Sequence, residues 1–464
     1  MRLSRSSVTI VGAGLTGPLL ALMLARRGLR VTLYERRPDP RHGKAEAGRS
    51  INLALAARGI GPLERCGLLA QVMPILVPMR GRLLHEPSGA TQLQPYGQRA
   101  GEIIHSVSRA ALNRVLVDAA ERAGAELHFG QRCVGVDATV GRLQLVEERS
   151  GRRLEASCDV IVGADGAGSP IRSSLAAAEV LDVRVDQLDH DYREMTIPAV
   201  EGTHALRADA LHIWPRGGFM LIALPNCDGS FTVTLFLGRT GRQSFAALND
   251  EAEVRRFFLE QFPDLEPHVA TLAADFRRNP QGYLATVHAS SWHFGGKVLV
   301  IGDAAHAIVP FHGQGMNAAF EDCAVLDQLL DRHGDWQALF EDFERRRRPD
   351  TDAIAEMALE NYVEMRDTVR DPQFKGMKKL AFELERRFPD RFIPRYSMVM
   401  FHPEIPYAEA LRRGRVQSSI LKQLNEQPMS SGYVDMALAE SLVQQLLPRV
   451  ASLGDEALAG ADGR

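Results

Sequence analysis

Three glycines and one acid near the start of the sequence have the types and spacing needed to bind a dinucleotide. Gly12, Gly14 and Gly17 form the pattern Gly-x-Gly-x-x-Gly, and Glu35 ends the second apolar run after them. In this pattern the first glycine permits a tight turn, the second lets a pyrophosphate approach the backbone, and the third lets a helix pack closely on a strand. The acid is placed to accept hydrogen bonds from a ribose hydroxyl, and it disfavours a 2′-phosphate. Although a chance glycine-rich turn would show the same glycines, the complete set predicts a site for FAD or NAD.

The elements around this pattern must hold it at the end of a parallel sheet. Residues 8–11 are a short β-rich run, residues 18–27 have a helical pattern, and residues 29–34 are a second β-rich run. A helix that follows the glycines presents unpaired N–H groups and a positive dipole to phosphates. We therefore expect one strand–helix–strand unit, with the glycine-rich turn between its first strand and its helix.

Two later segments each place an acid beside a glycine after an apolar run. They are Asp165-Gly166 and Gly302-Asp303. Taken singly, each also fits an ordinary strand-to-helix connection with an N-capping aspartate. Their meaning therefore depends on the other motifs of the chain.

A glycine-rich loop over residues 310–317 follows the second of these acids and leads into a helical pattern that runs to about residue 332. A helix that begins near Gly315 would point its N-terminal N–H groups at the pyrimidine ring of a flavin. Its positive dipole would stabilise the negative charge that builds on the ring during reduction. The alternative is a loop that only caps a core helix.

In their order along the chain, these motifs resemble those of the group A flavoprotein aromatic hydroxylases, which are single-component FAD monooxygenases. The resemblance implies the α/β fold of p-hydroxybenzoate hydroxylase, with a Rossmann-like FAD-binding domain, an inserted antiparallel-sheet substrate domain and a C-terminal helical region. It also implies that Asp165-Gly166 contacts FAD and the nicotinamide cofactor, that Asp303 binds the ribityl chain, and that Arg109 lies beside the FAD phosphates. The residues expected to bind FAD are Gly12, Gly14, Leu15, Gly17, Glu35, Arg36, Leu55, Arg109, Asp165, Gly166, Gly302, Asp303, Gly315, Met316 and Asn317.

Three further segments narrow the resemblance to the kynurenine 3-monooxygenases. They are residues 50–55, 80–85 and 311–317, and the resemblance extends to about Tyr396. It implies that NADPH reduces FAD, that O₂ then forms a C4a-hydroperoxyflavin, and that L-kynurenine is hydroxylated to 3-hydroxykynurenine in tryptophan degradation. The implied partners are L-kynurenine, NADPH and O₂, with no nucleic acid and no membrane. No catalytic side chain is assigned, and a homodimer is left open.

This substrate is an aromatic amine with a carboxylate on its tail, so its site must hold a carboxylate and an apolar ring. Arg82 and Tyr96 match the carboxylate ligands, and the planar fork of arginine suits that role because it makes two parallel hydrogen bonds. Asn361 and Met365 stand four residues apart on an expected helix and therefore share a face. From the residues alone, Arg82 would be a solvated strand residue, Asn361 a surface residue and Met365 a core residue. The residues expected to bind substrate are Arg82, Tyr96, Ile222, Leu224, Phe236, Phe311, His312, Asn361, Met365 and Tyr396, with His312 either a pocket wall or a proton partner.

Three runs separated by Pro/Gly turns predict an antiparallel sheet. The runs are residues 211–214, 219–224 and 231–237. In the second run Met220, Ile222 and Leu224 share one face, and in the third run Thr234 and Phe236 do so. This face is expected to floor an aromatic pocket, although alternating apolar residues equally make an ordinary core.

Because the three FAD motifs must converge on one cofactor, the FAD-binding domain is expected to be discontinuous. The predicted division assigns residues 1–75, 100–185 and 280–332 to the FAD-binding domain, 76–99 and 186–279 to the substrate-binding sheet domain, and 333–464 to the C-terminal helical region. Within that last region, Arg345 to Arg348, followed by Pro349, are expected to form a solvated helix end.

Composition and charge exclude several other classes of protein. The chain has 464 residues, 45% hydrophobic and 24% charged, with a formal net charge of −3, so it lacks the basic balance of a nucleic-acid-binding protein. Five scattered cysteines and 14 dispersed histidines lack the spacings of a disulfide framework or a metal site, so no metal is expected. No apolar run reaches the length of a membrane span. Residues 451–464 also lack the hydrophobic anchor of eukaryotic relatives, so we expect a cytoplasmic enzyme.

Two other functions remain open on the sequence. One is hydroxylation of a different aromatic acid, such as a salicylate or a quinolone precursor, by the same flavin chemistry. The other is a non-catalytic carrier on the same fold, like the Rab escort proteins, although such a carrier has little reason to keep both acid–glycine motifs. The residues do not determine the choice between NADPH and NADH or the oligomeric state.

Overall fold

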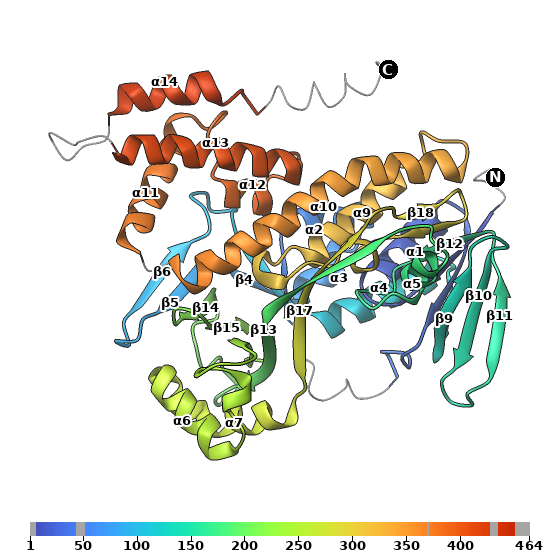
Figure 1. Cartoon of the computed structure of the whole chain (residues 1–464), viewed down its shortest axis with the longest axis horizontal. Helices are drawn as coiled ribbons and strands as arrows, with labels where there is room; N and C mark the ends of the chain where they lie inside the picture. Colours follow the sequence, from blue (N-terminus) through green and yellow to red (C-terminus); the bar gives the residue numbers. More distant parts are fainter. Residues whose placement is uncertain (1–5, 43–51, 369–370, 427–434, 451–464) are drawn as a thin grey trace.

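The computed structural model describes residues 6–42, 52–368, 371–426 and 435–450. Ser50 and Ile51, which belong to one segment behind the resemblance, and the tail at residues 451–464 lie outside the described residues. The described elements form two large sheets and a helical C-terminal region, which is the α/β architecture expected from the sequence (Figure 1).

The first large sheet carries the three FAD motifs. Its strands are ordered β18-β19-β12-β1-β2-β8, and every neighbouring pair is parallel except β18–β19. The bounds are β1 Ser7–Val11, β2 Arg30–Glu35, β8 Glu126–Phe129, β12 Val160–Gly163, β18 His293–Phe294 and β19 Val298–Val300. The motifs follow β1, β12 and β19, which are neighbours, so the three turns meet at the carboxyl ends of adjacent parallel strands.

The strand–helix–strand unit expected from the sequence is confirmed, with helix α1 (Thr16–Arg26) between β1 and β2. The helix begins before the predicted residue 18 because Pro18 falls in its first turn, where a missing N–H costs no hydrogen bond. α1 packs against α4 (Arg109–Arg122) and α9 (Gly315–Leu329), and its apolar residues are buried in the core of this sheet.

Smaller elements surround this sheet. Helix α5 (Pro170–Ala177) packs on a three-stranded sheet formed by β9 (Gln131–Asp137), β10 (Arg142–Glu147) and β11 (Arg153–Ser157). A second three-stranded sheet joins β3 (Asn52–Leu55), β7 (Ile104–Ser108) and β4 (Leu76–Met79). Helices α2 (Ala57–Arg65) and α3 (Leu69–Val72) follow β3, and α2 packs against α9. The small sheet and α2 therefore lie beside the helix that follows the glycine-rich loop at residues 310–317.

The second large sheet contains the antiparallel strands expected from the sequence. Its order is β17-β13-β16-β15-β14-β5-β6, and all neighbours are antiparallel except the β14–β5 pair. The bounds are β5 Gly81–His85, β6 Thr91–Pro95, β13 Val183–Ile197, β14 Ala210–Pro215, β15 Met220–Pro225, β16 Phe231–Gly238 and β17 Gln281–Ala289. The division into domains stays a prediction, and β17, which it assigned to the FAD-binding part, pairs with β13 in this sheet.

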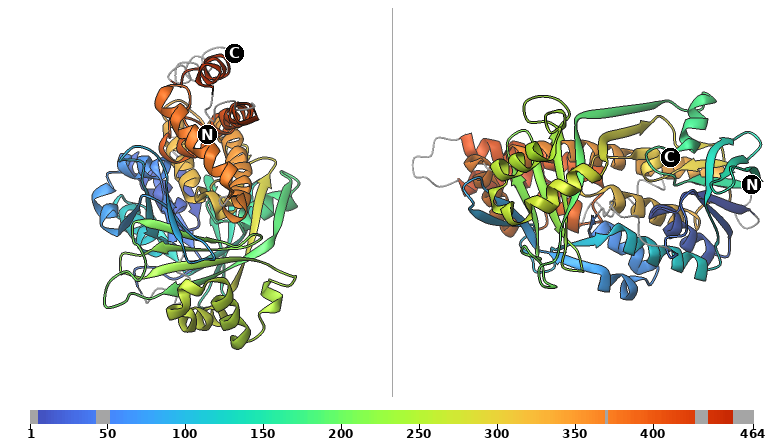
Figure 2. Two further views of the ribbon diagram at one scale, coloured as in Figure 1. Left: turned by 90° about the vertical axis from the view of Figure 1, so that its left-hand side faces the viewer. Right: turned by 90° about the horizontal axis from the view of Figure 1, so that it is seen from below.

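One face of the second sheet is covered by helices α6 (Glu251–Gln261) and α7 (Val269–Arg278), which complete an aromatic-rich core. Figure 2 shows these helices on one side of the sheet and the C-terminal helices on the other. The register places Met220 opposite Phe236 and Ile222 opposite Thr234. All four side chains line one cavity, so the prediction that Met220 and Ile222 share a face, as do Thr234 and Phe236, is confirmed.

The C-terminal region consists of α10 (Trp336–Arg366), α11 (Pro372–Arg387), α12 (Arg395–Phe401), α13 (Tyr407–Glu426) and α14 (Met436–Leu446). The helix end expected at Arg345 to Arg348 is wrong, because α10 continues through Pro349. Three of these arginines have exposed side chains, as expected, but Arg347 is 2% exposed. Arg347 is buried because α9 presents two carboxylates to it, at Glu321 and Asp322. Within the described ranges, no helix combines the length and the apolar composition needed to span a bilayer.

Candidate active site

A cavity of about 430 Å³ lies between the turns of the first sheet and the open face of the second. The glycine-rich turn after β1, the strand β3, the loop before α9 and strands β15 and β16 all contribute to its lining. Met365 from α10 and Tyr396 from α12 close it on the side of the C-terminal helices. The cavity therefore brings together residues from most of the segments that the sequence assigns to cofactor or substrate.

The three glycines of the first motif meet different constraints. A Cβ on Gly12, whose φ is +104°, would lie 2.5 Å from the Ala164 carbonyl oxygen, and a Cβ on Gly17 would lie 1.9 Å from the Gly12 carbonyl oxygen. A Cβ on Gly14 would meet no atom within 4 Å among the described residues, and Gly14 lines the cavity. Two glycines thus permit packing within the protein, while the third leaves room for a group that approaches from the cavity, as the pyrophosphate of FAD would.

The carboxylate of Glu35 lies at the end of β2, beside this turn. It is buried and accepts hydrogen bonds from the Ala13 N–H at 2.7 Å and from the backbone N–H and Nε of Arg37 at 2.9 Å. Burial alone would raise the pKa of Glu35, but these hydrogen bonds and the Arg37 charge lower it. Its charged oxygens fit the predicted role as ribose acceptors, whereas Arg36 is exposed beyond the strand.

The second and third motifs present different groups to the cavity. Gly166, with φ +83°, lines the cavity, while the Asp165 carboxylate accepts a hydrogen bond from the Ile171 N–H at 3.2 Å, at the start of α5. Burial raises the pKa of Asp165. Asp303 and Arg109 both line the cavity at helix N-termini, so a carboxylate and a guanidinium are available to the ribityl and phosphate groups of a flavin dinucleotide.

The loop before α9 has the conformation expected from the sequence. α9 begins at Gly315, and Gly315 and Met316 line the cavity. The Asn317 side chain accepts from the Ala56 N–H at 2.9 Å and donates to the Ala54 and Gly313 carbonyl oxygens at 2.8 and 2.9 Å. Asn317 therefore ties β3 to this loop, and Leu55 is fully buried beneath it, so the structure places both behind the cavity wall.

Arg82 is the charged group at the end of the cavity away from the glycine-rich turn. It is 4% exposed, and its Nη1 and Nη2 lie 3.3 Å from Glu364 Oε1 and 3.4 Å from Asn361 Oδ1. Its Nε–H has no hydrogen-bond partner among the described residues. Burial would lower the pKa of Arg82, but the contact with Tyr396 and the charge of Glu364 raise it, so the guanidinium stays charged and has donor capacity left for a ligand.

Three aromatic rings surround this guanidinium. Tyr396 stacks on Tyr96 at 5.8 Å and on His312 at 5.3 Å between ring centroids, and the Arg82 Cζ lies 4.6 Å from the Tyr396 centroid. Burial raises the pKa of both tyrosines, so their hydroxyls remain protonated donors. Burial, helped by the Arg82 charge, lowers the pKa of His312 to about 3, so its imidazole is neutral.

The remaining predicted substrate residues form an apolar wall. Phe311 stacks on Tyr362 at 3.9 Å and meets the edge of Phe236 at 4.9 Å. The Asn361 amide fixes the backbone beside Phe311, because its Nδ2 donates to the Phe311 carbonyl oxygen at 2.6 Å. The wall residues of the prediction that line the cavity are Ile222, Leu224, Phe236, Phe311 and Met365.

The sequence matches known proteins over nearly its whole length. A family model described as "FAD binding domain" matches residues 5–357. The kynurenine 3-monooxygenase of Stenotrophomonas maltophilia (strain K279a) is 46% identical over 443 residues, which cover 95% of this chain and 97% of that protein. This chain belongs to the kynurenine 3-monooxygenase family. Another member, from Xanthomonas oryzae pv. oryzae (strain MAFF 311018), is 46% identical over 96% of this chain and 98% of its own length.

Solved structures of flavin-dependent oxygenases share the fold at low identity. A Y270A mutant of 2-methyl-3-hydroxypyridine-5-carboxylic acid oxygenase superposes with a TM-score of 0.65 at 23% identity, covering 79% of this chain and 94% of that one. A p-nitrophenol 4-monooxygenase from Pseudomonas putida DLL-E4 superposes with a TM-score of 0.64 at 18% identity, covering 82% and 93%. At these identities the likeness concerns the fold alone.

In this member of the kynurenine 3-monooxygenase family, a second cavity of about 510 Å³ opens among α10, α11, α12 and α13. Four residues line both cavities and form the wall between them: Arg82, Tyr96, His312 and Tyr396. Sequence reasoning missed Glu364 and Lys378 in the second cavity, and burial lowers the pKa of Lys378 to about 8. Glu364 stands three residues after Asn361 on one helix face, a spacing that was visible in the sequence. Lys378 gave no such signal.

Proposed function

We propose that the protein hydroxylates L-kynurenine to 3-hydroxykynurenine with FAD, NADPH and O₂. The observation that carries this proposal is the buried guanidinium of Arg82 at the end of an otherwise largely apolar cavity whose opposite end holds the dinucleotide motifs. Such a cavity suits an aromatic molecule with a carboxylate tail, because the ring faces apolar side chains and the tail meets a charged donor. The names of the relatives agree with this chemistry.

The cofactor would be held by groups at the ends of neighbouring elements. The pyrophosphate would approach Gly14 and the N-terminus of α1, with Arg109 beside it and Asp303 on the ribityl hydroxyls. The N-terminus of α9, at Gly315, would place a positive dipole beside the flavin ring. When bound, FAD supplies the transfer of electrons from the nicotinamide cofactor and the activation of O₂.

The substrate would be held at both ends of its amino-acid tail. Arg82 would bind the carboxylate through its free donor capacity, supported by the hydroxyls of Tyr96 and Tyr396. Glu364, which lines the second cavity and pairs with Arg82 at the wall between the cavities, would attract the α-ammonium group by its negative charge. A tail that carries both charges would satisfy this pair better than the single carboxylate of a simple aromatic acid.

The ring would then lie against the wall formed by Ile222, Leu224, Phe236 and Phe311. This wall would exclude water from the reacting atoms and orient the ring carbon next to the amino group. Because His312 is neutral and buried, it would contribute a wall and a hydrogen-bonding nitrogen but no charge.

The test is substrate-stimulated NADPH oxidation by the FAD-loaded protein, with the product identified by mass. L-Kynurenine should stimulate oxidation and yield a product one oxygen heavier, whereas 4-(2-aminophenyl)-4-oxobutanoate, which lacks the α-ammonium, should act poorly. Salicylate and anthranilate serve as aromatic acids without the tail, and NADH serves as the alternative reductant. A preference for salicylate, or no stimulation by L-kynurenine, would overturn the proposal.

A further inference from the structure

A fully buried carboxylate, Asp322 on α9, accepts hydrogen bonds from three donors at once. The backbone N–H of Gly302 lies 3.0 Å from Oδ2, His306 Nε2 lies 2.6 Å from Oδ2, and Arg347 Nε lies 2.8 Å from Oδ1. Gly302 and His306 bracket helix α8 (Asp303–His306), which carries the cavity-lining carboxylate of Asp303. The Asp322 side chain therefore binds both the residue before α8 and the last residue of α8, on either side of Asp303.

This motif needs support from outside its own sequence. α8 is a single turn, and an isolated turn fixes several backbone angles for too few hydrogen bonds to be stable alone. Gly302 has φ +57° and ψ −142°, a conformation that is almost confined to glycine, and a Cβ there would lie 3.2 Å from both Ala319 and Thr16 side-chain atoms. Asp322 supplies the missing support at the residue before Asp303 and at the last residue of the turn.

Asp322 is in turn held by a buried arginine from α10. Arg347 is 2% exposed, and its Nη1 lies 2.8 Å from Glu321 Oε2 and 3.4 Å from Asp350 Oδ2. Its Nη2 donates to the Ala318 carbonyl oxygen at 3.3 Å. Burial would raise the pKa of Asp322, but His306 and Arg347 lower it. A buried ion pair that loses one partner leaves an uncompensated charge, so α10 must stay packed on α9 for the carboxylate to keep its position.

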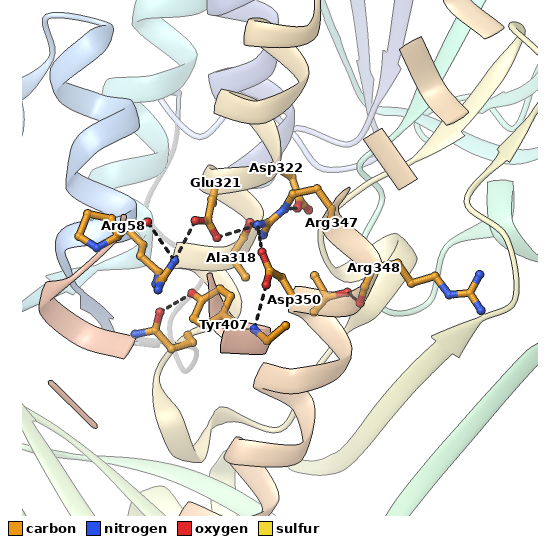
Figure 3. A network of polar contacts seen from close by, with 12 residues as sticks. Arg58, Ala318, Glu321, Asp322, Arg347, Arg348, Asp350 and Tyr407 are labelled. Atoms are coloured by element: carbon orange, nitrogen blue, oxygen red, sulfur yellow. Dashed lines mark hydrogen bonds and ion pairs between the residues drawn. The ribbon is translucent and has the colours of Figure 1, made fainter. Parts of the chain in front are cut away.

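The same network reaches the last helices of the fold. Glu321 also pairs with Arg58 of α2 at 2.9 Å, and the Arg58 Cζ lies 4.0 Å from the Tyr407 ring centroid. The Tyr407 hydroxyl donates to Gln314 Oε1 at 2.7 Å, in the loop that precedes α9. Figure 3 shows the part of this network that contains Arg58, Glu321, Arg347 and Tyr407. The hydrogen bonds of Asp322 extend it to the turn that carries Asp303.

We propose that Asp322 is a positioning residue for the FAD-binding carboxylate of Asp303, and that Arg347 makes this positioning depend on the packing of α10 against α9. The inference concerns the cofactor and stands whichever aromatic substrate is hydroxylated.

Asp322→Asn tests the proposal because asparagine is nearly the same size but cannot satisfy three donors. Its single oxygen can face either Arg347 or the Gly302 and His306 donors, and its NH₂ group must then face another donor. We expect the dissociation constant for FAD to rise about tenfold or more. At saturating FAD, the KM for the aromatic substrate should stay within twofold of the parent value.

The matched control is Asp342→Asn, on the neighbouring helix α10. Asp342 is a nearly buried carboxylate that pairs with His333, Arg345 and Arg346 and contacts no FAD motif in the described chain. The readouts are FAD affinity, from quenching of FAD fluorescence on addition to the apoprotein, the visible circular dichroism of the bound flavin, and the Tm of each apoprotein. The proposal expects both variants to lower the Tm, but only Asp322→Asn to weaken FAD and to change the flavin dichroism.

His306→Phe provides a second variant, which decides the matter should Asp322→Asn fail to fold. Phenylalanine keeps a ring against Trp292, 5.0 Å away in the parent, and removes only the Nε2 donor to Asp322. A severalfold loss of FAD affinity supports the proposal. FAD affinity within twofold of the parent in the folded variants, or equal weakening by Asp342→Asn, overturns it.

Discussion

Replacement of Arg82 by lysine tests the carboxylate site most sharply, because it keeps the charge and removes the fork. Arg82 is 4% exposed, and its two terminal nitrogens face different partners, Glu364 at 3.3 Å and Asn361 at 3.4 Å. An ammonium has no planar pair of donors and cannot occupy both positions at once. Arg82→Lys should therefore retain attraction for the substrate carboxylate but lose one directed hydrogen bond.

The expected magnitude follows from the burial of the site. A hydrogen bond to a charged group contributes about 1.5–3 kcal/mol, so Arg82→Lys should lower kcat/KM for L-kynurenine about 10- to 150-fold. Arg82→Met removes the charge as well and leaves the substrate carboxylate unpaired. Breaking a buried pair costs about 3–5 kcal/mol, which corresponds to a loss of at least about 150-fold.

The assay compares two substrates in FAD-saturated protein, with product measured by mass. 2′-Aminobutyrophenone keeps the aromatic amine and the ketone but has no carboxylate, so both variants should use it as well as the parent does. Arg255→Lys, at an exposed position on α6 on the other face of the sheet, controls for an unspecific effect of the exchange. An unchanged kcat/KM for L-kynurenine in Arg82→Lys, or an equal loss with both substrates, would refute the reasoning.

Three further predictions concern the cofactor turn, the pH dependence of stability and the substrate ammonium. Gly14→Ala should fold with a Tm near the parent value and lose FAD. Gly17→Ala should not fold stably, because its Cβ would lie 1.9 Å from the Gly12 carbonyl oxygen. Flavin absorbance measures the bound FAD of each variant, and thermal unfolding measures its stability. Burial lowers the pKa of His312 to about 3 from an ordinary value of 6.5. Between about pH 3 and pH 6.5, His312 is therefore protonated in the unfolded chain and neutral in the folded chain. Stability should therefore fall as the pH drops below about 6.5, and His312→Phe should flatten this slope in denaturant titrations; an unaltered slope would contradict the assignment of a neutral imidazole. Glu364→Gln should raise the KM for L-kynurenine about tenfold and leave that for 4-(2-aminophenyl)-4-oxobutanoate unchanged in steady-state kinetics.

The parts of the site that follow from local chemistry were predictable from the sequence. Gly12 has the positive φ that the turn needs, and Gly17 packs on the carbonyl oxygen of Gly12 in the same turn, so their spacing predicted β1, α1 and β2. The alternation of Ile222 and Leu224 likewise predicted which face of β15 lines the cavity. In each case the pattern and the structure depend on residues that are near one another in the chain.

The parts that depend on distant contacts were not predictable in the same way. Arg347 reads as one of four consecutive arginines, and only the acids of α9 show that it is buried. Asp165 and Asp303 each stand beside a glycine after an apolar run, so the sequence does not distinguish them. In the structure the Asp165 carboxylate accepts a hydrogen bond from the start of α5, and Asp165 does not line the cavity. The second cavity is formed by the packing of α10 to α13, which are distant in sequence. No local pattern around Lys378 therefore predicted that it lines a cavity.

The strand order of the first sheet determines when a growing chain can first hold its cofactor. β1 meets β2 early in synthesis, but its other neighbour, β12, begins only at Val160, and β19 begins only at Val298. Until β12 has left the ribosome, the edge of β1 that it covers is open to pairing with another chain. FAD cannot protect this edge, because Asp303 is made later still. Cofactor supply therefore acts on chains that are already about two-thirds made.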